Sequence, residues 1–198
     1  MVVAASALEE TARGAFGREV RRIAIYEFEG RVPQIGEGTY ISPQASVIGE
    51  VTIGKECFIA PGARIKGDYG TIIIGSRTSI QENCVLHAAP GERLEIGSEV
   101  TVGHGAILHH CKICDYVVIG MGAIITYFAE VGEGAIIGEG SVVGKDKRIP
   151  PKKIAVGVPA RTIRDVSEEE MRMYKAGVQI YVEMAKRYAG GLKEVRKV

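Results

Sequence analysis

An aliphatic residue recurs at every sixth position through most of this chain, and this period constrains the fold more than any other feature. The recurring positions, called anchors below, are Ile35, Ile41, Val47, Ile53, Ile59 and Ile65, then Ile74, Ile80 and Leu86, then Ile96, Val102 and Leu108, and finally Ile119, Ile125, Val131, Ile137, Val143 and Ile149. Helical and alternating periods fit this segment poorly. A period of six is the signature of hexapeptide-repeat β-helices.

The hexapeptide period predicts an all-β solenoid, a parallel β-helix. Each repeat supplies one short strand and a turn, and three repeats complete one triangular coil. The aliphatic side chain points inward and stacks on its counterpart one coil away. Because no coil can bury its core alone, stacking between neighbouring coils provides the stability. Glycines that follow an anchor, such as Gly54 and Gly138, suit the tight bends between strands.

Three irregularities interrupt the period, and all of them lie close to the histidines. Segment 65–74 contains three extra residues, and segment 86–96 contains four. Segment 108–113 lacks one residue. Insertions in a solenoid are expected to form loops on one face, which is often the functional face.

After residue 149 the repeat fades. Prolines in the following segment indicate extended chain. Ser167 and Glu170 form a capping-box pattern at the start of a helix that Gly190-Gly191 should end. An apolar stripe on this helix is expected to pack against the β-helix, and it consists of Met171, Tyr174, Val178, Tyr181, Val182 and Ala185.

These patterns divide the chain into three parts. Residues 1–23 form an N-terminal extension without the period, to which we assign no function. Residues 24–160 form the β-helix, and residues 161–198 form the C-terminal helix and tail.

Three of the four histidines fall within VGHGAILHHC at 102–111, and the fourth is His87. The repeat register decides which of them can meet. His87 follows the anchor Leu86, and His109 follows Leu108, so their separation of 22 residues is one coil of 18 plus the insertion of 4. The two imidazoles should therefore stack on one face, on strands about 4.8 Å apart, where both can bind one metal ion.

His104 lies two places after its anchor, on the preceding face of the coil. It cannot easily complete a site with His87 and His109 in one chain, but three prisms around a threefold axis would let each donate His104 to a neighbour. His110 adjoins His109 and should point the opposite way, so we exclude it as a ligand. Solvated loop histidines, or a decayed or purely structural site, are the alternatives.

Three neutral imidazoles with an open fourth position favour a catalytic zinc site. The metal lowers the pKa of bound water to about 7 and so yields hydroxide at neutral pH. Iron or cobalt would also suit three imidazoles.

Charge and composition exclude several function classes. The chain carries 25 Lys and Arg against 24 Asp and Glu, so nucleic acid and anionic membranes are not expected partners. It has no apolar run near 18 residues and no secretory signal pattern, so we expect a cytoplasmic protein. Cys111 and Cys114 have the C-x-x-C spacing of a redox pair or half a zinc site. Without a second such pair, we interpret the four cysteines as small buried side chains.

Four segments resemble the gamma-class carbonic anhydrases and their relatives, which include ferripyochelin-binding-like proteins and the hexapeptide proteins of carnitine and phenylacetate pathways. The segments are IKGD at 65–68, SIQENCVLH at 79–87, VGHGAILHHC at 102–111 and VGVPAR at 156–161. The resemblance covers about residues 24 to 188. It implies left-handed coiling and a homotrimer with metal sites between subunits.

The resemblance also implies roles for single residues. His87 and His109 match the two ligands from one subunit, and His104 matches the ligand from its neighbour. Gln81 matches the glutamine that orients the metal-bound water. Asp68 matches an aspartate that pairs charges across the interface and shapes the pocket.

Two site positions and one loop depart from the family pattern. Lys66 stands where the family has Arg, and Lys cannot make the bidentate carboxylate fork of Arg. Glu82 stands where an Asp is usual, and its greater length makes it a candidate partner for Lys66. The acidic loop that carries a proton-shuttle glutamate in well-known members is short here, and Glu92 and Glu95 are the candidate substitutes.

These residues favour reversible hydration of carbon dioxide to bicarbonate by a metal-bound hydroxide. A second hypothesis is metal-dependent hydrolysis of an acyl-coenzyme A thioester, with phosphates near Lys152, Lys153 and Arg161. A third is a metal-binding scaffold with little turnover. Acyl transfer is disfavoured, because hexapeptide transferases usually rely on a single catalytic histidine.

Overall fold

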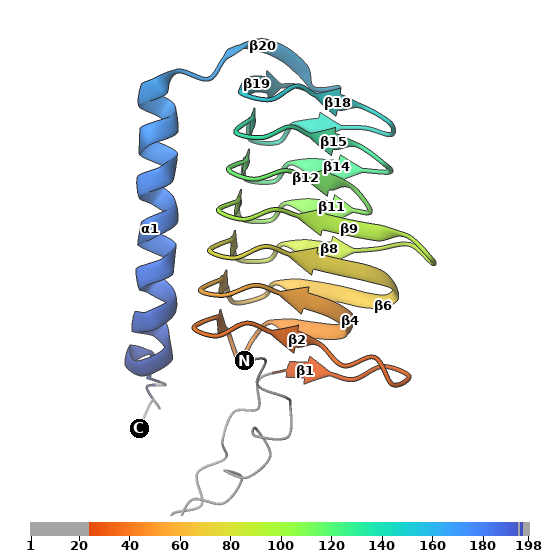
Figure 1. Cartoon of the computed structure of the whole chain (residues 1–198), viewed down its shortest axis with the longest axis vertical. Coiled ribbons are helices and arrows are strands. Elements are labelled where there is room, and N and C mark those ends of the chain that lie inside the picture. The colour runs from red at the N-terminus through yellow and green to blue at the C-terminus, as the bar shows by residue number, and fades with distance from the viewer. Residues whose placement is uncertain (1–23, 194, 196–198) are drawn as a thin grey trace, which may run out of the picture.

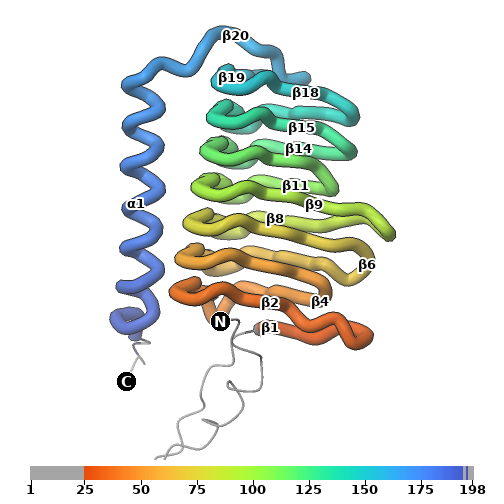
Figure 2. Tube along the Cα trace, viewed as in Figure 1, coloured from red at the N-terminus to blue at the C-terminus, as the bar shows by residue number. Residues whose placement is uncertain are grey.

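The computed structural model describes residues 24–193 and residue 195, which form a prism of stacked coils with one long helix beside it (Figures 1 and 2). The N-terminal extension proposed from the sequence, residues 1–23, lies outside the described residues. The coils stack from β1 (Ala24–Tyr26) at one end to β19 (Lys153–Val156) at the other. The fold is the left-handed parallel β-helix with a C-terminal helix that the sequence predicts.

One face of the prism, called the helix face below, is an eight-stranded sheet. Its strands pair in parallel from coil to coil, except that the last two pair antiparallel. In chain order they are β3 (Tyr40–Ile41), β5 (Phe58–Ile59), β7 (Ser79–Ile80), β10 (Thr101–Val102), β13 (Val118–Ile119), β16 (Ile136–Ile137), β19 and β20 (Arg161–Asp165).

The other two faces belong to one twelve-stranded sheet, because β4 (Ser46–Ile53) and β6 (Arg64–Ile74) run from one face to the next. The histidine face holds the first halves of β4 and β6 together with β1, β8 (Val85–His87), β11 (Ile107–His109), β14 (Ile124–Thr126) and β17 (Val142–Val143). The charged face holds their second halves together with β2 (Gln34–Ile35), β9 (Arg93–Ile96), β12 (Lys112–Ile113), β15 (Glu130–Val131) and β18 (Arg148–Ile149).

Two corners of the prism position the functional side chains. At the first corner the chain turns from the helix face to the histidine face, as at residues 103–106 between β10 and β11. At the second corner it turns from the histidine face to the charged face, as at residues 110–111 between β11 and β12.

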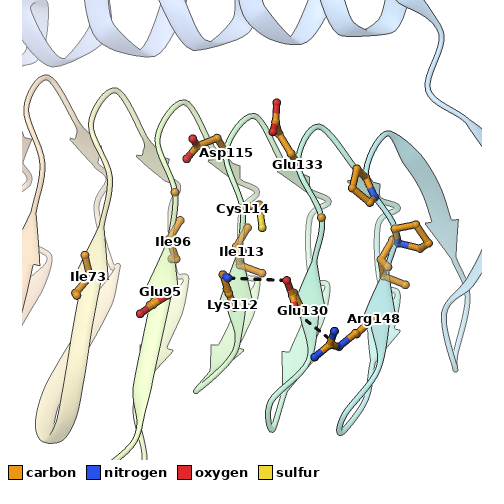
Figure 3. Close-up of a pocket in the computed structure, with 15 residues that line it drawn as sticks. Ile73, Glu95, Ile96, Lys112, Ile113, Cys114, Asp115, Glu130, Glu133 and Arg148 are labelled. Carbon is orange, nitrogen blue, oxygen red and sulfur yellow. Dashed lines mark ion pairs between the residues drawn. The ribbon is translucent and has the colours of Figure 1, made fainter.

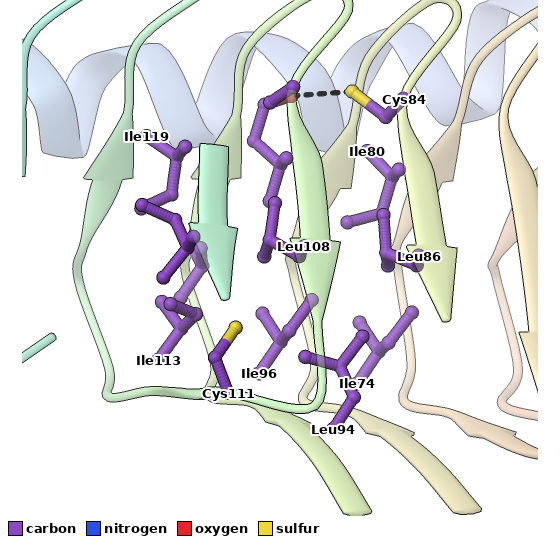
Figure 4. Close-up of a cluster of buried hydrophobic side chains, with 14 of the residues drawn as sticks. Ile74, Ile80, Cys84, Leu86, Leu94, Ile96, Leu108, Cys111, Ile113 and Ile119 are labelled. Atoms are coloured by element: carbon purple, nitrogen blue, oxygen red, sulfur yellow. Dashed lines mark hydrogen bonds between the residues drawn. The ribbon is translucent and has the colours of Figure 1, made fainter. Parts of the chain in front are cut away.

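The anchors form the core, as predicted, and every anchor from Ile41 to Ile149 is buried. They stack in register from coil to coil, so that Leu86 lies against Leu108 and Ile96 against Ile113 (Figure 4). Each fully buried side chain of this size contributes about 1.5–3 kcal/mol relative to an exposed one. The stack therefore fixes the spacing of everything attached to it.

The irregularities of the period behave differently from one another. The four extra residues of segment 86–96 form a turn before β9, as predicted. The three extra residues of segment 65–74 were predicted to form a loop, and that prediction is wrong. They remain extended within β6, which pairs with β4 on one side and with β8 and β9 on the other. The pairing with β4 shifts register between Gly49 and Val51, so the extra residues form a bulge, and residues 68–70 have no strand partner in β4, β8 or β9.

Helix α1 (Glu168–Gly191) begins at the predicted capping box and ends at the predicted glycines. The Ser167 hydroxyl accepts the Glu170 backbone N–H at 3.2 Å, and the Glu170 carboxylate accepts the Ser167 N–H at 2.9 Å. In the described residues no helix is both long and apolar enough to cross a bilayer.

Helix α1 packs on the helix face of the prism (Figure 1), as its apolar stripe predicts. Val178, Val182 and Ala185 are buried. Stacked and edge-on aromatic contacts fix the docking, and they join Tyr40, Phe58, Tyr181 and Tyr188. The helix therefore holds Tyr181 against the middle coils, where the site described next begins.

Candidate metal centre

His87 and His109 are partners in the parallel pairing of β8 and β11, which confirms the stacking predicted from the register. The His87 Nδ1 and His109 Nε2 atoms lie 3.2 Å apart, and the ring centroids are 5.1 Å apart. Both side chains are partly exposed at the end of their strands, beside the second corner.

Asp68 fixes the orientation of the His87 ring. The Asp68 Oδ1 atom lies 3.1 Å from His87 Nε2, and its Oδ2 atom lies 3.0 Å from Lys66 Nζ. Burial acts to raise the pKa of Asp68, but hydrogen bonds from Lys66 and His87 outweigh it and lower the pKa. Because the carboxylate can only accept, His87 Nε2 carries the proton, and the lone pair of Nδ1 faces His109.

The backbone at Gly67 explains why Asp68 reaches His87. A Cβ atom at Gly67 would lie 2.5 Å from the carbonyl oxygen of Glu50 in the coil before it. Only glycine therefore lets β6 approach β4 this closely as the strand turns the second corner.

His104 lies at the first corner and does not contact the pair. Its Nδ1 atom lies 2.6 Å from Glu82 Oε2, and its side chain is 50% exposed. Because Nδ1 faces Glu82, Nε2 is the ring nitrogen that is left for another partner. In one chain, Lys66 pairs with Asp68 and Glu82 pairs with His104, so the suggested Lys66–Glu82 pair is not formed within the chain.

Gln81 links His104 to helix α1, a connection that sequence reasoning missed. The His104 backbone N–H donates to Gln81 Oε1 at 3.2 Å, and Gln81 Nε2 donates to the Tyr181 hydroxyl at 2.6 Å. Burial and the Glu82 carboxylate raise the pKa of Tyr181, so its hydroxyl stays neutral. Tyr181 belongs to the predicted apolar stripe. The stripe pattern shows that a tyrosine packs against the prism, but it does not show whether its hydroxyl also forms a hydrogen bond.

The predicted direction of His110 is wrong. Its ring lies 4.6 Å from the His109 ring, on the same side, rather than pointing away. Alternation of side chains holds only in extended backbone, and β11 ends at His109, while His110 has φ +29°. His110 is buried, and its ring packs edge-on against Tyr127 and Phe128 of the next coil.

A metal ion fits the facing nitrogen atoms of the pair. A tetrahedral ion with metal–nitrogen distances of about 2.0–2.1 Å holds two ligand atoms roughly 3.3 Å apart, close to the observed 3.2 Å. Burial, followed by neighbouring His110 and His87, lowers the pKa of His109 and keeps it neutral, as a ligand must be. Asp68 on the far nitrogen of His87 is the outer partner typical of metal-bound histidines.

One chain supplies only part of such a site. Within residues 24–193 and residue 195, no group of three or more His, Cys, Asp or Glu side chains is arranged to hold a metal ion. Asp68, His87 and His109 lie in a row rather than around a common point. A site with three ligands would therefore need one from outside these residues.

The proposed proton-shuttle candidates lie outside this row. Glu95 is on the charged face and pairs with Arg93 at 3.0 Å. Glu92 is exposed in the turn that follows β8, where its backbone N–H donates to the carbonyl of Ala89. The structure brings neither carboxylate into hydrogen-bond contact with His87 or His109.

An open hollow of about 710 Å³ lies on the charged face, away from the histidines (Figure 3). A ladder of alternating charges lines it, in which Glu130 Oε1 lies 3.9 Å from Lys112 and Glu130 Oε2 lies 3.6 Å from Arg148. Cys114 also lines the hollow, whereas Cys111 points into the core (Figures 3 and 4). The two thiols are free and lie on opposite sides of the wall, so the C-x-x-C spacing does not form a disulfide here.

Comparison with known proteins places this geometry in context. The family described as bacterial transferase hexapeptide (six repeats) matches residues 33–67 and 110–145. A carbonic anhydrase of Geobacillus kaustophilus is 41% identical over 164 residues, covering 83% of this chain and 90% of that protein. The carnitine operon protein CaiE of Escherichia coli is 32% identical over 174 residues, covering 88% and 89%.

A solved structure from Bacillus cereus, assigned provisionally as an acetyltransferase, superposes with a TM-score of 0.82. It is 39% identical and covers 83% of this chain and 96% of its own. The similar proteins match more than four fifths of this chain, and their names refer to different kinds of chemistry.

Proposed function

The chain belongs to the gamma-class carbonic anhydrase-like family of hexapeptide-repeat proteins, and on that premise we propose that it catalyses the reversible hydration of carbon dioxide. The reaction takes place at a metal centre shared between subunits of a homotrimer. Two ligands, His87 and His109, come from one subunit, and His104 comes from the next.

One observation carries the proposal: two of the three histidines are already oriented by carboxylates. Asp68 accepts from Nε2 of His87, and Glu82 accepts from Nδ1 of His104. Each ring is left with its other nitrogen, which is His87 Nδ1 facing His109 and, on the half-exposed side chain of His104, Nε2. Carboxylate partners of this kind fix the tautomer of metal-binding histidines.

The rise of the solenoid supports the shared site. Each coil climbs about 4.8 Å along the prism axis, and the chain reaches the first corner before the second. His104, at a first corner, therefore lies at a height between the second corners that carry His87 and His109. A threefold axis parallel to the prism keeps these heights, so His104 of the partner subunit would arrive between the two rings.

A divalent ion at this site, zinc or alternatively iron or cobalt, would lower the pKa of a water molecule enough to supply a nucleophile at neutral pH. Asp68 holds the His87 ring in place, and Lys66 neutralises the Asp68 charge. Gln81 anchors the backbone of His104 and is itself held by Tyr181. The amide of Gln81 has a second N–H, which is suited to orienting an oxygen atom of water or bicarbonate.

The first test is hydration of carbon dioxide, measured by stopped flow on metal-replete protein. His104→Ala should lose nearly all activity while keeping the fold. If the His104→Ala protein is as active as the parent, the proposed assignment of ligands is wrong.

Subunit mixing tests whether the site is shared. His87→Ala chains lack one ligand of the pair, and His104→Ala chains lack the third ligand. In a mixed trimer, a site is intact where a His104→Ala chain supplies the pair and its neighbour, a His87→Ala chain, supplies His104. Random assembly of equal amounts should restore about a quarter of the parent activity. The matched control mixes His87→Ala with His109→Ala chains, which damage the same half-site and should restore none.

A second candidate is metal-dependent hydrolysis of an acyl-coenzyme A thioester. The 39%-identical structure assigned provisionally as an acetyltransferase favours it. Of the suggested phosphate contacts, Lys153 is engaged with Asp165, while Lys152 and Arg161 are exposed. A panel of acyl-coenzyme A substrates with thiol detection separates the two activities, and bound metal without either activity would leave a scaffold role.

A further inference from the structure

An aromatic cluster covers the second corner one coil beyond the histidine pair. Tyr127 packs 5.2 Å from His109 and 4.9 Å from His110, measured between ring centroids, and Phe128 packs 4.8 Å from His110. Yet Tyr127 is 48% exposed and Phe128 is 51% exposed. Two large aromatic side chains thus stand half in solvent directly beside the proposed site.

The backbone under this cluster is left-handed, as it is at other corners of the prism such as Glu99, Tyr116 and Asp146. His110, Tyr127 and Phe128 have φ values of +29°, +42° and +65°, in or near the left-handed region that glycine and asparagine favour. Such conformations cost free energy for bulky side chains, and they tend to cluster at functional sites. In one chain about half of the surface of Tyr127 and of Phe128 stays exposed and is open to a contact from outside the chain.

A complementary residue lies at the first corner. The pairing of Val102 with Ile119 puts Met121 at the same repeat position as His104, one coil further on. Met121 is 52% exposed. A methionine side chain is flexible and polarisable, and its sulfur packs favourably against aromatic rings.

The same rise along the prism axis that places His104 between His87 and His109 places Met121 one coil higher. Met121 lies in height between His110 at one second corner and Tyr127-Phe128 at the following one. We propose that Met121 of the partner subunit inserts against the aromatic cluster and so sets the height at which His104 meets the histidine pair. This inference rests on the shared trimeric site of the proposed function and adds a second contact between subunits.

The surfaces on either side of this contact favour a second copy as the occupant. One coil below His104, Glu82 at the first corner falls in height between Lys66 and His87 at the second corner, so a carboxylate would approach Lys66 across the interface. Between the corners, Val85 and Ile107 form an apolar pair on the histidine face, 40% and 39% exposed. At the first corner, a charged residue (Glu82), a proposed ligand (His104) and an apolar residue (Met121) follow one another from coil to coil. The second corner carries their expected partners in the same order.

Engineered cysteines test the contact directly. In a Met121→Cys, Phe128→Cys protein, mild oxidation should join neighbouring subunits and give covalent dimers and trimers on a non-reducing gel. A bond within one chain cannot form, because the three residues of β14 alone span about 10 Å, whereas a disulfide needs Cα atoms within about 7 Å. Each single variant, and the pair Met173→Cys with Phe128→Cys, should remain uncross-linked, since Met173 is exposed on α1.

A charge placed at the contact gives an independent readout. Met121→Asp should lower the mass in solution from three chains to one and reduce bound metal per chain at least tenfold, whereas Met121→Leu should keep both. Met173→Asp is the matched control and should change neither. A trimer that binds metal and hydrates carbon dioxide, but does not cross-link and tolerates Met121→Asp, overturns this inference while the proposed function stands.

The opposite result is equally informative. Cross-linking at Met121 and Phe128 without hydration activity would uphold the contact and reject the proposed function. If Phe128→Ala leaves the mass unchanged and instead alters KM for acyl substrates, the cluster is a substrate wall and the inference is wrong.

Discussion

Removing the hydroxyl of Tyr181 isolates the contribution of helix α1 to the proposed metal centre. In Tyr181→Phe the ring still packs on Phe58, at 5.8 Å between centroids, but the Gln81 amide loses its 2.6 Å partner. Gln81 is only 5% exposed, so water does not readily replace the hydroxyl. Tyr188→Phe is the matched control, because Tyr188 packs on Tyr40 and Phe58 of the same aromatic cluster.

The magnitude follows from the buried amide. A buried donor left without an acceptor costs about 1–3 kcal/mol, whereas a hydroxyl without a buried partner costs little. For a protein of this size, 1 kcal/mol shifts the unfolding temperature by about 2–4 °C. Tyr181→Phe should therefore lower it by about 2–12 °C, and Tyr188→Phe by less than about 2 °C. Both proteins must be compared at one subunit concentration, because assembly contributes to stability.

Activity should change as well, since Gln81 also holds the backbone of His104. Loss of outer partners of metal ligands typically costs 10–100-fold in metal affinity or activity. Stopped-flow hydration and metal titration of the two variants measure this, with circular dichroism following unfolding. Equal behaviour of Tyr181→Phe and Tyr188→Phe in stability and hydration would refute the chain of contacts from α1 through Gln81 to His104.

Three further predictions concern the fold. Leu108→Ala, in the middle of the stack, should destabilise by about 2.7–5 kcal/mol in urea unfolding, and a loss below 1 kcal/mol would contradict the core described here. Hydrogen bonds from Arg164 and Ser167 lower the pKa of Glu170 to about 2, so its stabilising effect is present above its ordinary pKa and lost as pH falls toward 2. The unfolding midpoints of parent and Glu170→Gln should thus converge between pH 5 and about 2, and a constant gap would reject the cap's electrostatic role. Cys114 should react first with a thiol reagent, because burial raises the pKa of the other three thiols to about 11 or about 12. Equal reaction rates at all four cysteines would mean that the buried thiols are accessible to the reagent.

The stacked pair could be predicted from counting alone, because a solenoid converts sequence separation into height. Once the insertion of segment 86–96 is set aside, His87 and His109 differ by one coil, and the observed pairing has that register. The same arithmetic placed the anchors from Ile41 to Ile149 in the core. Such counting works because every coil has nearly the same outline and every strand is locked to both neighbours.

Counting could not give contacts made by parts of the chain outside the period. Tyr181 reaches Gln81 only because α1 runs alongside the helix face, and the position of a helix on a prism is set by tertiary packing. Counting also could not predict the direction of side chains at the corners. The prediction that His110 points away rested on two-residue alternation, which fails where the backbone leaves the extended region. The sequence has no glycine at this position that would have indicated the turn.

The candidate site lies where all three departures from the period meet at one corner, and the insertion within β6 carries Asp68. On the coil of His87, the four-residue insertion lengthens the second corner into the turn before β9. On the next coil, the missing residue of segment 108–113 tightens the same corner to residues 110–111 and draws His110 under Tyr127. A regular repeat would give every coil the same corner and leave no reason for one pair of strands to differ from the rest. The uniform stack fixes the distance between the imidazoles. The unequal corners give this pair of strands surroundings that differ from those of the other pairs in the described residues. A shift of one irregularity by one coil would therefore separate the aromatic cluster from the proposed metal ligands.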